Sequence, residues 1–489
     1  MSAAAYDPFN RTLIGQPRAL ATLFMTEMWE RFSYYGMRAL LVLFMITPTN
    51  DGGMGFSAAK AAGIYAIYVA LVYLTPLPGG WIGDRLLGAR RTVFLGGAII
   101  AGGHIVLAIF GGAGLFPALL LIIIGTGLLK PNMTAMVGGI YDYKPDLRDA
   151  GFSIYYMGIN LGAFLAPLVC GYLGQQVSWE LGFGAAALGM IAALIQYAIG
   201  IRGLGPIGAK PENPLTGDER RRCGIGVVVA AVVGAALIML DVKAVHLSSD
   251  AIELLITVVI VLIPIGWFAR TLRDERANAA NRSKVIVLLV LFVAAAVFWL
   301  VYDQAGSTVA IFAQEDTRNV VFGWQFPSSW FQSVNPLLII ALAPVMAAVW
   351  TALGARGRQP GTAYKFAGGL FLVAVSMLVM VFAAHAAIDG KVAALWLIAV
   401  FAIQTVGELM LSPVGMAAAT RLSPPDRISQ TLGVWFLATS VGDAIGGRIA
   451  VYYDQLGQQA FFGLLGAIAL VAALVVLALA RPLGRLVPN

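Results

Sequence analysis

The sequence predicts an all-α membrane protein with 14 transmembrane helices, arranged as two bundles of six helices with two further helices inserted between them. Of the 489 residues, 59% are hydrophobic and only 12% are charged, whereas soluble domains carry about 25% charged residues. The apolar residues form long continuous runs, whereas a β-barrel would show short alternating segments. This composition excludes a soluble enzyme, a disordered protein and a nucleic-acid-binding protein.

Fourteen apolar runs match the roughly 20 residues that a helix needs to cross the hydrocarbon core of a bilayer. We place these spans at 22–46, 57–82, 92–111, 115–141, 149–174, 179–203, 224–243, 250–271, 284–314, 328–353, 364–386, 392–420, 429–452 and 457–480. They divide the chain into a cytoplasmic tail (1–21), a six-helix bundle (22–203), a cytoplasmic linker (204–223), two inserted helices (224–271), a second cytoplasmic linker (272–283), a second six-helix bundle (284–482) and a cytoplasmic tail (483–489).

The basic residues support this division. Of the 32 Lys and Arg residues, 24 fall in one set of connections and four fall inside spans, whereas the opposite set holds only Lys60, Lys243, Arg318 and Lys391. Because basic connections stay in the cytoplasm, we expect both termini there. The first residues show no secretory signal peptide, so we expect the first span to act as its own insertion signal. The two cysteines and three histidines are far apart, so no disulfide, metal site or cofactor is expected.

A weak internal repeat favours two related halves. A Gly-rich basic turn follows the second span of each half, at 80–91 and at 354–358. The turn resembles the loop motif of the major facilitator superfamily, although two ordinary basic cytoplasmic turns would produce a similar pattern.

The first span carries four charged residues, Glu27, Glu30, Arg31 and Arg38. At about 100° per residue, these residues and Tyr34 fall within an arc of about 100° on one helix face. Facing lipid, the four charges would cost on the order of 10 kcal/mol, so we expect this face to point into the protein. A buried ion-pair network that only holds helices together is the alternative.

Later spans also contain polar residues in their interiors, where such residues tend to face a cavity or a partner. They are Lys130 before Pro131, Asn160 one turn after Tyr156, Asp303 one turn after Trp299, Asn335 before Pro336, Glu408 one turn before Ser412, and Asp443 and Arg448 in the eleventh span of the two bundles. We expect a kink at Pro336 and a structural role for Asp443 and Arg448.

The interior charges are distributed unevenly between the halves. Most of the bases lie in the first half, whereas Asp303 and Glu408 lie in the second. A cavity between the halves would therefore have one positive and one negative wall, which suits a zwitterion with separated charges. Since an extended chain spans about 3.3–3.6 Å per residue, a di- or tripeptide fits this separation better than a single amino acid.

These residues stand in motifs that resemble those of the proton-dependent oligopeptide transporters. The segment from Glu27 to Gly36 is similar to the family motif ExxERFxYYG, and the resemblance extends over about residues 20 to 450. Further matching segments are 73–76, 80–85, 127–132, 152–162, 298–304, 335–336, 407–413 and 433–436. The resemblance implies a major facilitator fold that alternates access around a central site, and bacterial members of the family also carry two inserted helices.

The resemblance also implies roles for individual residues. The peptide carboxylate would meet Arg31, Arg38 and Lys130, and the peptide amino group would meet Glu408. The other substrate-binding residues would be Tyr34, Tyr35, Tyr73, Tyr156, Asn160, Trp299, Asn335, Ser412 and Trp435, and the proton-coupling residues would be Glu27, Glu30, Arg31 and Asp303. Two features depart from relatives: the second span lacks the His of mammalian members, and Asp303 stands where many relatives have Glu.

The expected function is therefore proton-coupled import of di- and tripeptides across the bacterial inner membrane by a monomer, with the proton as the only coupling ion and no nucleic-acid partner. A carrier of nitrate or another anion, as among some plant relatives, is one alternative, although such carriers often lack the ExxER residues. A receptor or sensor that binds peptide without moving it is another. A membrane enzyme is disfavoured because no Ser/His/Asp group or HExxH motif occurs.

Overall fold

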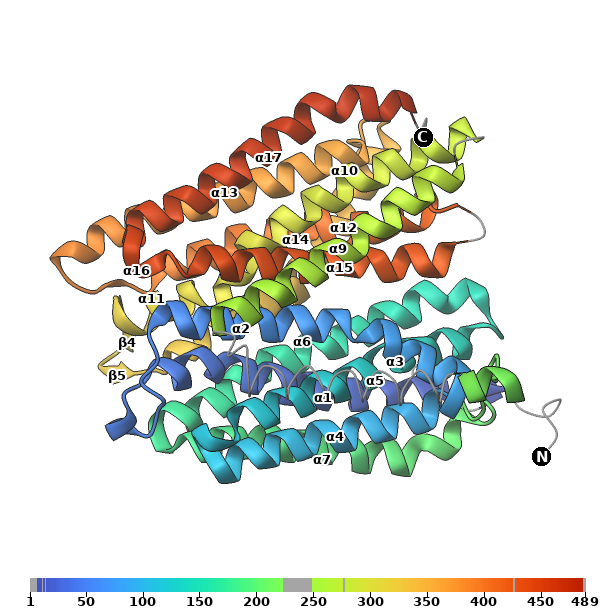
Figure 1. Ribbon diagram of the computed structural model, residues 1–489, viewed down its shortest axis with the longest axis horizontal. Coiled ribbons are helices and arrows are strands. Elements are labelled where there is room, and N and C mark those ends of the chain that lie inside the picture. Colours follow the sequence, from blue (N-terminus) through green and yellow to red (C-terminus); the bar gives the residue numbers. More distant parts are fainter. Residues whose placement is uncertain are drawn as a thin grey trace.

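The computed structural model describes residues 7–486 except 11, 14, 223–248, 276–277 and 425–426. The described chain is almost entirely helical and forms two bundles that lie side by side (Figure 1). Within this part, ten helical stretches are long and apolar enough to cross a membrane, and one of them, Ala89–Tyr141, contains two successive helices. The span predicted at 224–243 lies outside the described residues.

The first bundle contains seven helical segments. They are α1 (Arg18–Ile46), α2 (Ala58–Leu74), α3 (Pro76–Ile82), α4 (Ala89–Phe110), α5 (Leu115–Tyr141), α6 (Arg148–Tyr172) and α7 (Trp179–Gly200). The span predicted at 57–82 is divided at Thr75 because Pro76 begins a new helix there. A π-helical turn at Gly83–Leu87 follows, and Gly88, whose φ is +79°, directly precedes α4.

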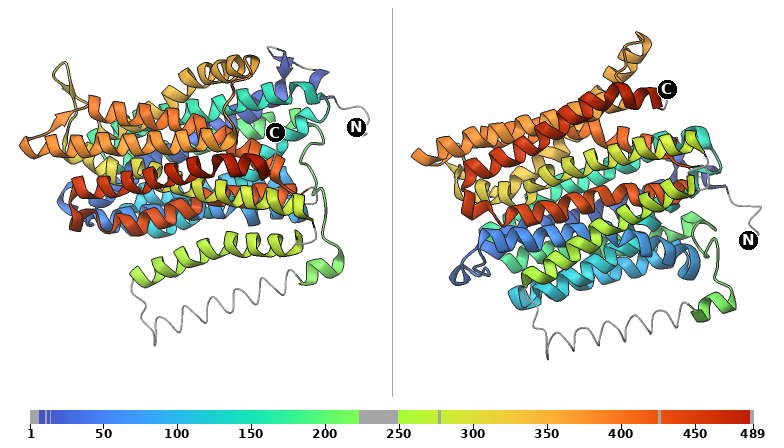
Figure 2. Two further views of the ribbon diagram at one scale, coloured as in Figure 1. Left: turned by 90° about the horizontal axis from the view of Figure 1, so that it is seen from above. Right: turned by 45° about the horizontal axis from the view of Figure 1, so that its top comes forward.

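The second half of the described chain contains further α-helices of different lengths. They are α9 (Ser249–Asp274), α10 (Ala279–Tyr302), α11 (Thr308–Glu315), α12 (Val334–Ala355), α13 (Thr362–Ala386), α14 (Leu395–Leu422), α15 (Ile428–Ala450), α16 (Tyr453–Leu456) and α17 (Gln458–Leu486). The predicted span 284–314 is not one continuous helix, because α10 ends at Tyr302 and a 3₁₀ turn, η11 (Asp303–Gly306), separates it from α11. Figure 2 shows α9 along the outside of the two bundles.

Short elements complete the described chain. The 3₁₀ and π turns are η2 (Pro8–Asn10), η3 (Thr49–Asp51), η4 (Gly83–Leu87), η5 (Gly111–Gly114), η6 (Pro145–Leu147), η7 (Leu173–Val177), η8 (Ile201–Leu204), η12 (Ser328–Ser333) and η13 (Ala387–Asp389). The strands are β1 (Thr12–Leu13), β2 (Gln16–Pro17), β3 (Thr317–Arg318), β4 (Val320–Val321), β5 (Trp324–Gln325) and β6 (Val392–Ala393). Strands β1–β2 and β4–β5 pair antiparallel and β3–β6 parallel.

The charged helix α1 lies inside the first bundle, packed against α6 and α7. Gly162 of α6 allows this approach, because a Cβ atom at that position would overlap the carbonyl oxygen of Met28. Glu27, Glu30 and Arg31 are each at most 3% exposed. The predicted polar face of the first span therefore points into the protein, as its charges require.

The two bundles touch most extensively along α2 and α15, where small residues meet. A Cβ atom added to Gly447 would overlap the Cβ atom of Ala66. Hydrogen bonds join the bundles at the end where α11, β4 and β5 lie, opposite the start of α1 and the end of α17 (Figure 1). There, the Gln175 side-chain amide donates to Ser328 Oγ at 3.0 Å, and Ser333 Oγ donates to the Phe164 carbonyl at 2.8 Å.

The segment after α7 runs along the opposite end of the first bundle. Arg90 Nε donates to the Ile207 carbonyl at 2.7 Å, and Arg85 Nη2 lies 2.9 Å from Glu219 Oε1. Thr216 and Glu219 also bond to each other: the backbone N–H of Thr216 donates to Glu219 Oε2 at 2.9 Å, and the Glu219 N–H donates to Thr216 Oγ1 at 3.4 Å. This reciprocal pattern caps the helical residues 217–222.

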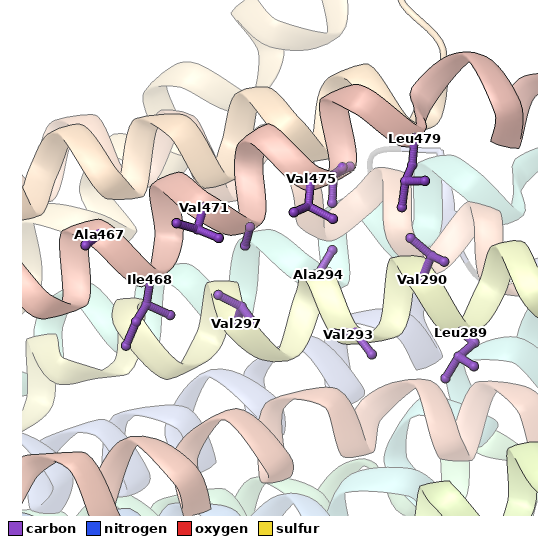
Figure 3. A pocket seen from close by; sticks show the side chains of 12 residues that line it. Leu289, Val290, Val293, Ala294, Val297, Ala467, Ile468, Val471, Val475 and Leu479 are labelled. Atoms are coloured by element: carbon purple, nitrogen blue, oxygen red, sulfur yellow. The ribbon is translucent and has the colours of Figure 1, made fainter.

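A groove of about 620 Å³ lies between α10 and α17 (Figure 3). Its lining is apolar throughout and includes Val293, Val297 and Val471, of which Val293 and Val471 are more than half exposed. Exposed aliphatic side chains on a membrane helix suit contact with lipid tails. The polar residues singled out in the sequence lie elsewhere, in and between the two bundles.

Candidate functional site

The first polar group, which we call the Arg31 cluster, consists of Glu27, Glu30, Arg31 and Tyr155. Arg31 lies one helical turn after Glu27, with Nε 3.3 Å from Glu27 Oε1, and its Nη2 donates to Glu30 Oε1 at 2.8 Å. Arg31 Nε also pairs with Glu30 Oε2. Tyr155 of α6 donates its hydroxyl to Glu27 Oε2 at 2.7 Å. One guanidinium is thus held between two carboxylates in the interior of the first bundle.

Lys130 of α5 lies within electrostatic range of this cluster, but forms no ion pair in the described part of the chain. Its ammonium group lies 4.3 Å from the centre of the Tyr73 ring, a cation–π contact. A ring compensates a cation only in part, since such contacts contribute about 0.5–2 kcal/mol. Lys130 is therefore a cation whose charge has no carboxylate partner in the described structure.

The second group, the Arg38 cluster, consists of Arg38, Tyr65 and Asp303 and bridges the bundles. Arg38 Nη2 lies 2.7 Å from Asp303 Oδ1, and Arg38 Nε donates to the Tyr65 hydroxyl. The helix break after Tyr302 places Asp303 at this position. Gly306, in the same turn, leaves room for Tyr65, because a Cβ atom there would overlap the tyrosine hydroxyl.

The third group, the Glu408 cluster, lies within the second bundle and consists of Tyr302, Asn335, Thr405 and Glu408. Tyr302 donates its hydroxyl to Glu408 Oε2 at 2.6 Å, and Asn335 Nδ2 donates to the same oxygen at 3.0 Å. Asn335 Nδ2 also lies 3.0 Å from Thr405 Oγ1. These partners are uncharged, and Glu408 forms no ion pair in the described residues. The carboxylate is thus oriented without being neutralised.

The position of Asn335 corrects one sequence-based expectation. We expected a kink at Pro336 inside a span, but α12 begins at Val334, directly after the 3₁₀ turn η12. Pro336 therefore lies in the first turn of α12, where a missing backbone N–H breaks no helical hydrogen bond. The helix start, rather than a kink, presents Asn335 to Glu408.

Aromatic side chains lie among the three clusters. Arg31 lies 5.1 Å from the centre of the Tyr34 ring, and Arg38 lies 5.8 Å from that of Tyr35. The Tyr34 and Tyr35 rings contact edge to face at 5.1 Å. Trp299 packs in the same way against Tyr302, at 5.2 Å. These rings therefore contact the arginines of the first two clusters and Tyr302 of the third.

Four expected substrate-binding residues lie at the margins of this arrangement. Tyr156 is 45% exposed, and Asn160 Nδ2 donates to the backbone carbonyl of Tyr156 at 3.0 Å rather than to another helix. Trp435 is 8% exposed and packs against Phe366, with ring centres 6.3 Å apart. Ser412 is partly buried, one turn beyond Glu408.

The sequence analysis missed three hydroxyl groups: those of Tyr155 and Tyr302, which donate to acids, and that of Tyr65, which accepts from Arg38. Tyr155 stands in the quoted segment 152–162 and Tyr302 directly precedes Asp303, so both were adjacent to chosen residues. No local pattern indicated that Tyr155 rather than Tyr156 faces a carboxylate, or that Tyr302 faces one. Arg448, expected to be structural, lies with Nη1 3.6 Å from Glu253 Oε2 and so connects α15 to the inserted helix α9.

The comparisons with known proteins agree with the predicted family and fold. Residues 90–471 match the POT family (PTR2). The chain is 40% identical over 489 residues to the di-/tripeptide transporter of Lactococcus lactis subsp. cremoris, covering 98% of each chain. It is 37% identical to the peptide transporter YePEPT of Yersinia enterocolitica, covering 100% of this chain and 99% of that one.

Solved structures show the same relationship. The crystal structure of peptide transporter POT in complex with sulfate is 43% identical, with a TM-score of 0.95 over 99% of both chains. A POT family transporter in complex with 5-aminolevulinic acid is 35% identical, with a TM-score of 0.93, covering 98% of this chain and 99% of that chain. The all-α fold of the major facilitator superfamily predicted from the sequence is confirmed, and this chain belongs to the POT family of transporters.

Proposed function

We propose that this protein is a symporter that imports di- and tripeptides together with protons by alternating access. The observation that carries the proposal is a pair of opposite charges in opposite bundles, neither of which is directly ion-paired in the described residues. Among the residues that the structure describes, Lys130 supplies a cation without a carboxylate partner, and Glu408 a carboxylate without a cationic partner. A peptide zwitterion complements both charges at once. The relatives named as di-/tripeptide transporters support the same substrate class.

In this proposal the peptide is held at its two ends. Its carboxylate binds Lys130 and, after displacing an acid, Arg31. Its amino group binds Glu408, which Tyr302 and Asn335 hold in place. The remaining proposed substrate residues, which surround the peptide backbone and side chains, are Tyr34, Tyr35, Arg38, Tyr73, Tyr156, Asn160, Trp299, Ser412 and Trp435. Aromatic rings can bind different peptide side chains, because they offer a large apolar surface and require few directional hydrogen bonds.

Proton coupling follows from the charge balance around Arg31. When both acids are ionised, the two negative charges of Glu27 and Glu30 equal the two positive charges of Arg31 and Lys130. A peptide carboxylate entering this buried region adds one negative charge, which is costly in a low-dielectric interior. Uptake of one proton by Glu27 or Glu30 restores the balance and frees Arg31 for the peptide. Peptide and proton therefore favour each other's binding.

Alternating access requires that the contacts between the bundles open and close. The Arg38–Asp303 ion pair and the hydrogen bonds of Gln175 hold the bundles together at one end. The positive-inside pattern assigns this end to the cell exterior and both termini to the cytoplasm. We propose that the bundles 22–203 and 284–482 move against each other in a monomer in the bacterial inner membrane.

The test is uptake of radiolabelled dialanine into proteoliposomes with and without an inward proton gradient. We expect accumulation above equilibrium only with the gradient. Binding of dialanine to the same purified protein is measured in parallel. Binding without gradient-driven uptake would contradict symport and favour the sensor, and inhibition of uptake by nitrate would favour the anion carrier.

A further inference from the structure

Asp443 of α15 is a buried acid with no role in the function derived so far. It is 4% exposed, and neither carboxylate oxygen has a hydrogen-bond donor among the described residues. A buried carboxylate that is ionised and lacks donors is strongly disfavoured, because it loses its hydration and gains nothing in return. Asp443 therefore requires either a proton or a partner.

The group that Asp443 faces is the carboxyl group of Asp303, which lies within hydrogen-bonding range. Glycines on either side of Asp443 allow this approach. A Cβ atom at Gly442 would lie 2.5 Å from the Ala296 carbonyl oxygen, and one at Gly446 would lie 3.0 Å from that of Leu300. The end of α10 and the Asp303 turn are thus pressed against α15.

The other charged and titratable groups around Asp443 have partners of their own. From α1, Arg38 is paired with Asp303, and from α2, the Tyr65 hydroxyl accepts from Arg38. On α10 and α14, Tyr302 and Glu408 are bonded to each other. On α9, Glu253 pairs with Arg448. Among the described residues, Asp303 is the acid that lies within hydrogen-bonding range of Asp443.

Two carboxylates at hydrogen-bonding distance cannot both be ionised when only one guanidinium is available to them. A single proton resolves this conflict, because it supplies the donor that both carboxylates lack. Arg38 together with a singly protonated pair then carries no net charge, as a buried site requires. The Arg38–Asp303 ion pair is retained in this state.

We propose that Asp443 shares one proton with Asp303, and that the two carboxyl groups form a proton site whose charge controls the Arg38 ion pair between the bundles. The role in transport rests on the proposed symport. Uptake of a second proton neutralises both acids and leaves Arg38 without an anionic partner, which favours separation of the bundles there. Release of that second proton restores the shared-proton state and the Arg38 ion pair, which favours closure.

The first test is infrared spectroscopy of the purified full-length protein at neutral pH, which detects the carbonyl band of a protonated carboxyl group. We expect D443N and D303N each to lose the same one band, because in either variant the remaining acid pairs with Arg38 and ionises. The double variant D303N/D443N loses that one band and no second one. The exposed Asp389→Asn variant serves as the control and keeps the band.

Two results would overturn the proposal. If D303N keeps the band that D443N loses, Asp443 holds its own proton without sharing it. If D443N loses no band, Asp443 is ionised. Size-exclusion profiles and thermal unfolding show whether each variant is folded, and the isosteric Asn substitution preserves volume.

Transport measurements then test the functional part. Proton-driven dialanine uptake is expected to persist at a reduced rate in each single variant and to be lost in the double variant, because one carboxyl group can still pair with Arg38 and accept a proton. Wild-type uptake in D443N, together with equal losses in D303N and the double variant, would contradict this role. A shared infrared band without gradient-driven uptake by the wild type would instead contradict symport and leave the carboxyl pair intact.

Discussion

Arg38 of α1 and Asp303, the first residue after α10, form an ion pair that joins the two bundles, with Nη2 2.7 Å from Oδ1. The two residues are 265 positions apart in the chain. Both side chains are largely buried, so the pair is screened less by water and salt than a surface ion pair. Any group that alters the charge of Asp303 therefore acts directly on the contact between the bundles.

The Gly306→Ala substitution is expected to disturb this contact. The added methyl group would overlap the Tyr65 hydroxyl and displace this group, which accepts a hydrogen bond from Arg38. We expect a loss of about 1–3 kcal/mol in the free energy of unfolding, measured by thermal or denaturant unfolding in detergent. Gly184→Ala in α7, where a Cβ atom would have no neighbour within 4 Å, is the matched control and is expected to be neutral or stabilising. Equal stability of the two variants would contradict the close fit at Tyr65.

The Lys130→Ala substitution is expected to remove recognition of the peptide carboxylate. A hydrogen bond to a charged group contributes about 1.5–3 kcal/mol, so dialanine should bind about 10- to 150-fold more weakly. The wild type should prefer dialanine over its C-terminal amide, and Lys130→Ala should show a much smaller preference, because only Arg31 then remains to bind the carboxylate; competition for uptake measures both. The exposed Lys391→Ala variant should keep the preference. An undiminished preference in Lys130→Ala would place the carboxylate away from Lys130.

The Glu30→Gln substitution tests proton coupling at the Arg31 cluster. Glutamine keeps the size of the side chain but cannot take up a proton. We expect loss of gradient-driven accumulation, whereas exchange of labelled for unlabelled dialanine across the membrane continues. The exposed Glu180→Gln variant should keep both activities. Equal loss of accumulation and exchange in Glu30→Gln would argue against a coupling role.

The docking of the linker after α7 is expected to depend on pH through Glu219. Hydrogen bonds from the Thr216 backbone N–H and hydroxyl, together with the nearby Arg85, lower the pKa of the Glu219 carboxyl. Because the pKa of Glu219 is lower in the docked linker, the ionised carboxylate stabilises docking onto the first bundle at pH values above the ordinary Glu range. This stabilisation is lost as the pH falls through the lowered pKa and the carboxylate is protonated. Residues 213–219 should therefore exchange amide hydrogens faster in acid, after correction for intrinsic rates.

The matched variants for this prediction lie in the same linker. Glu219→Gln should show fast exchange at every pH, because the charge is absent throughout. Glu212→Gln, also exposed, should behave as the wild type. If amide exchange in the wild-type linker did not change with pH, the prediction would be contradicted.

Contacts between residues close together in the chain could be predicted from the sequence, whereas contacts between residues far apart in the chain could not. Glu27, Glu30 and Arg31 lie within two turns of one helix, so helical periodicity alone predicted their common face. Tyr302 and Glu408 are 106 positions apart, and no local pattern encodes their contact. The break after Tyr302 was also missed, because the apolar residues of α11 continue the hydrophobic run beyond Asp303.

The contact of Gly447 with Ala66, where α2 meets α15, bears on the speed of the conformational cycle. Small residues form few interlocking ridges, so one bundle can slide over the other without large side chains having to pass each other. The activation barrier should then be low, and the balance between the two conformations should depend on a few polar contacts worth about 0.5–1.5 kcal/mol each. A single proton or a single peptide carries enough free energy to reverse such a balance.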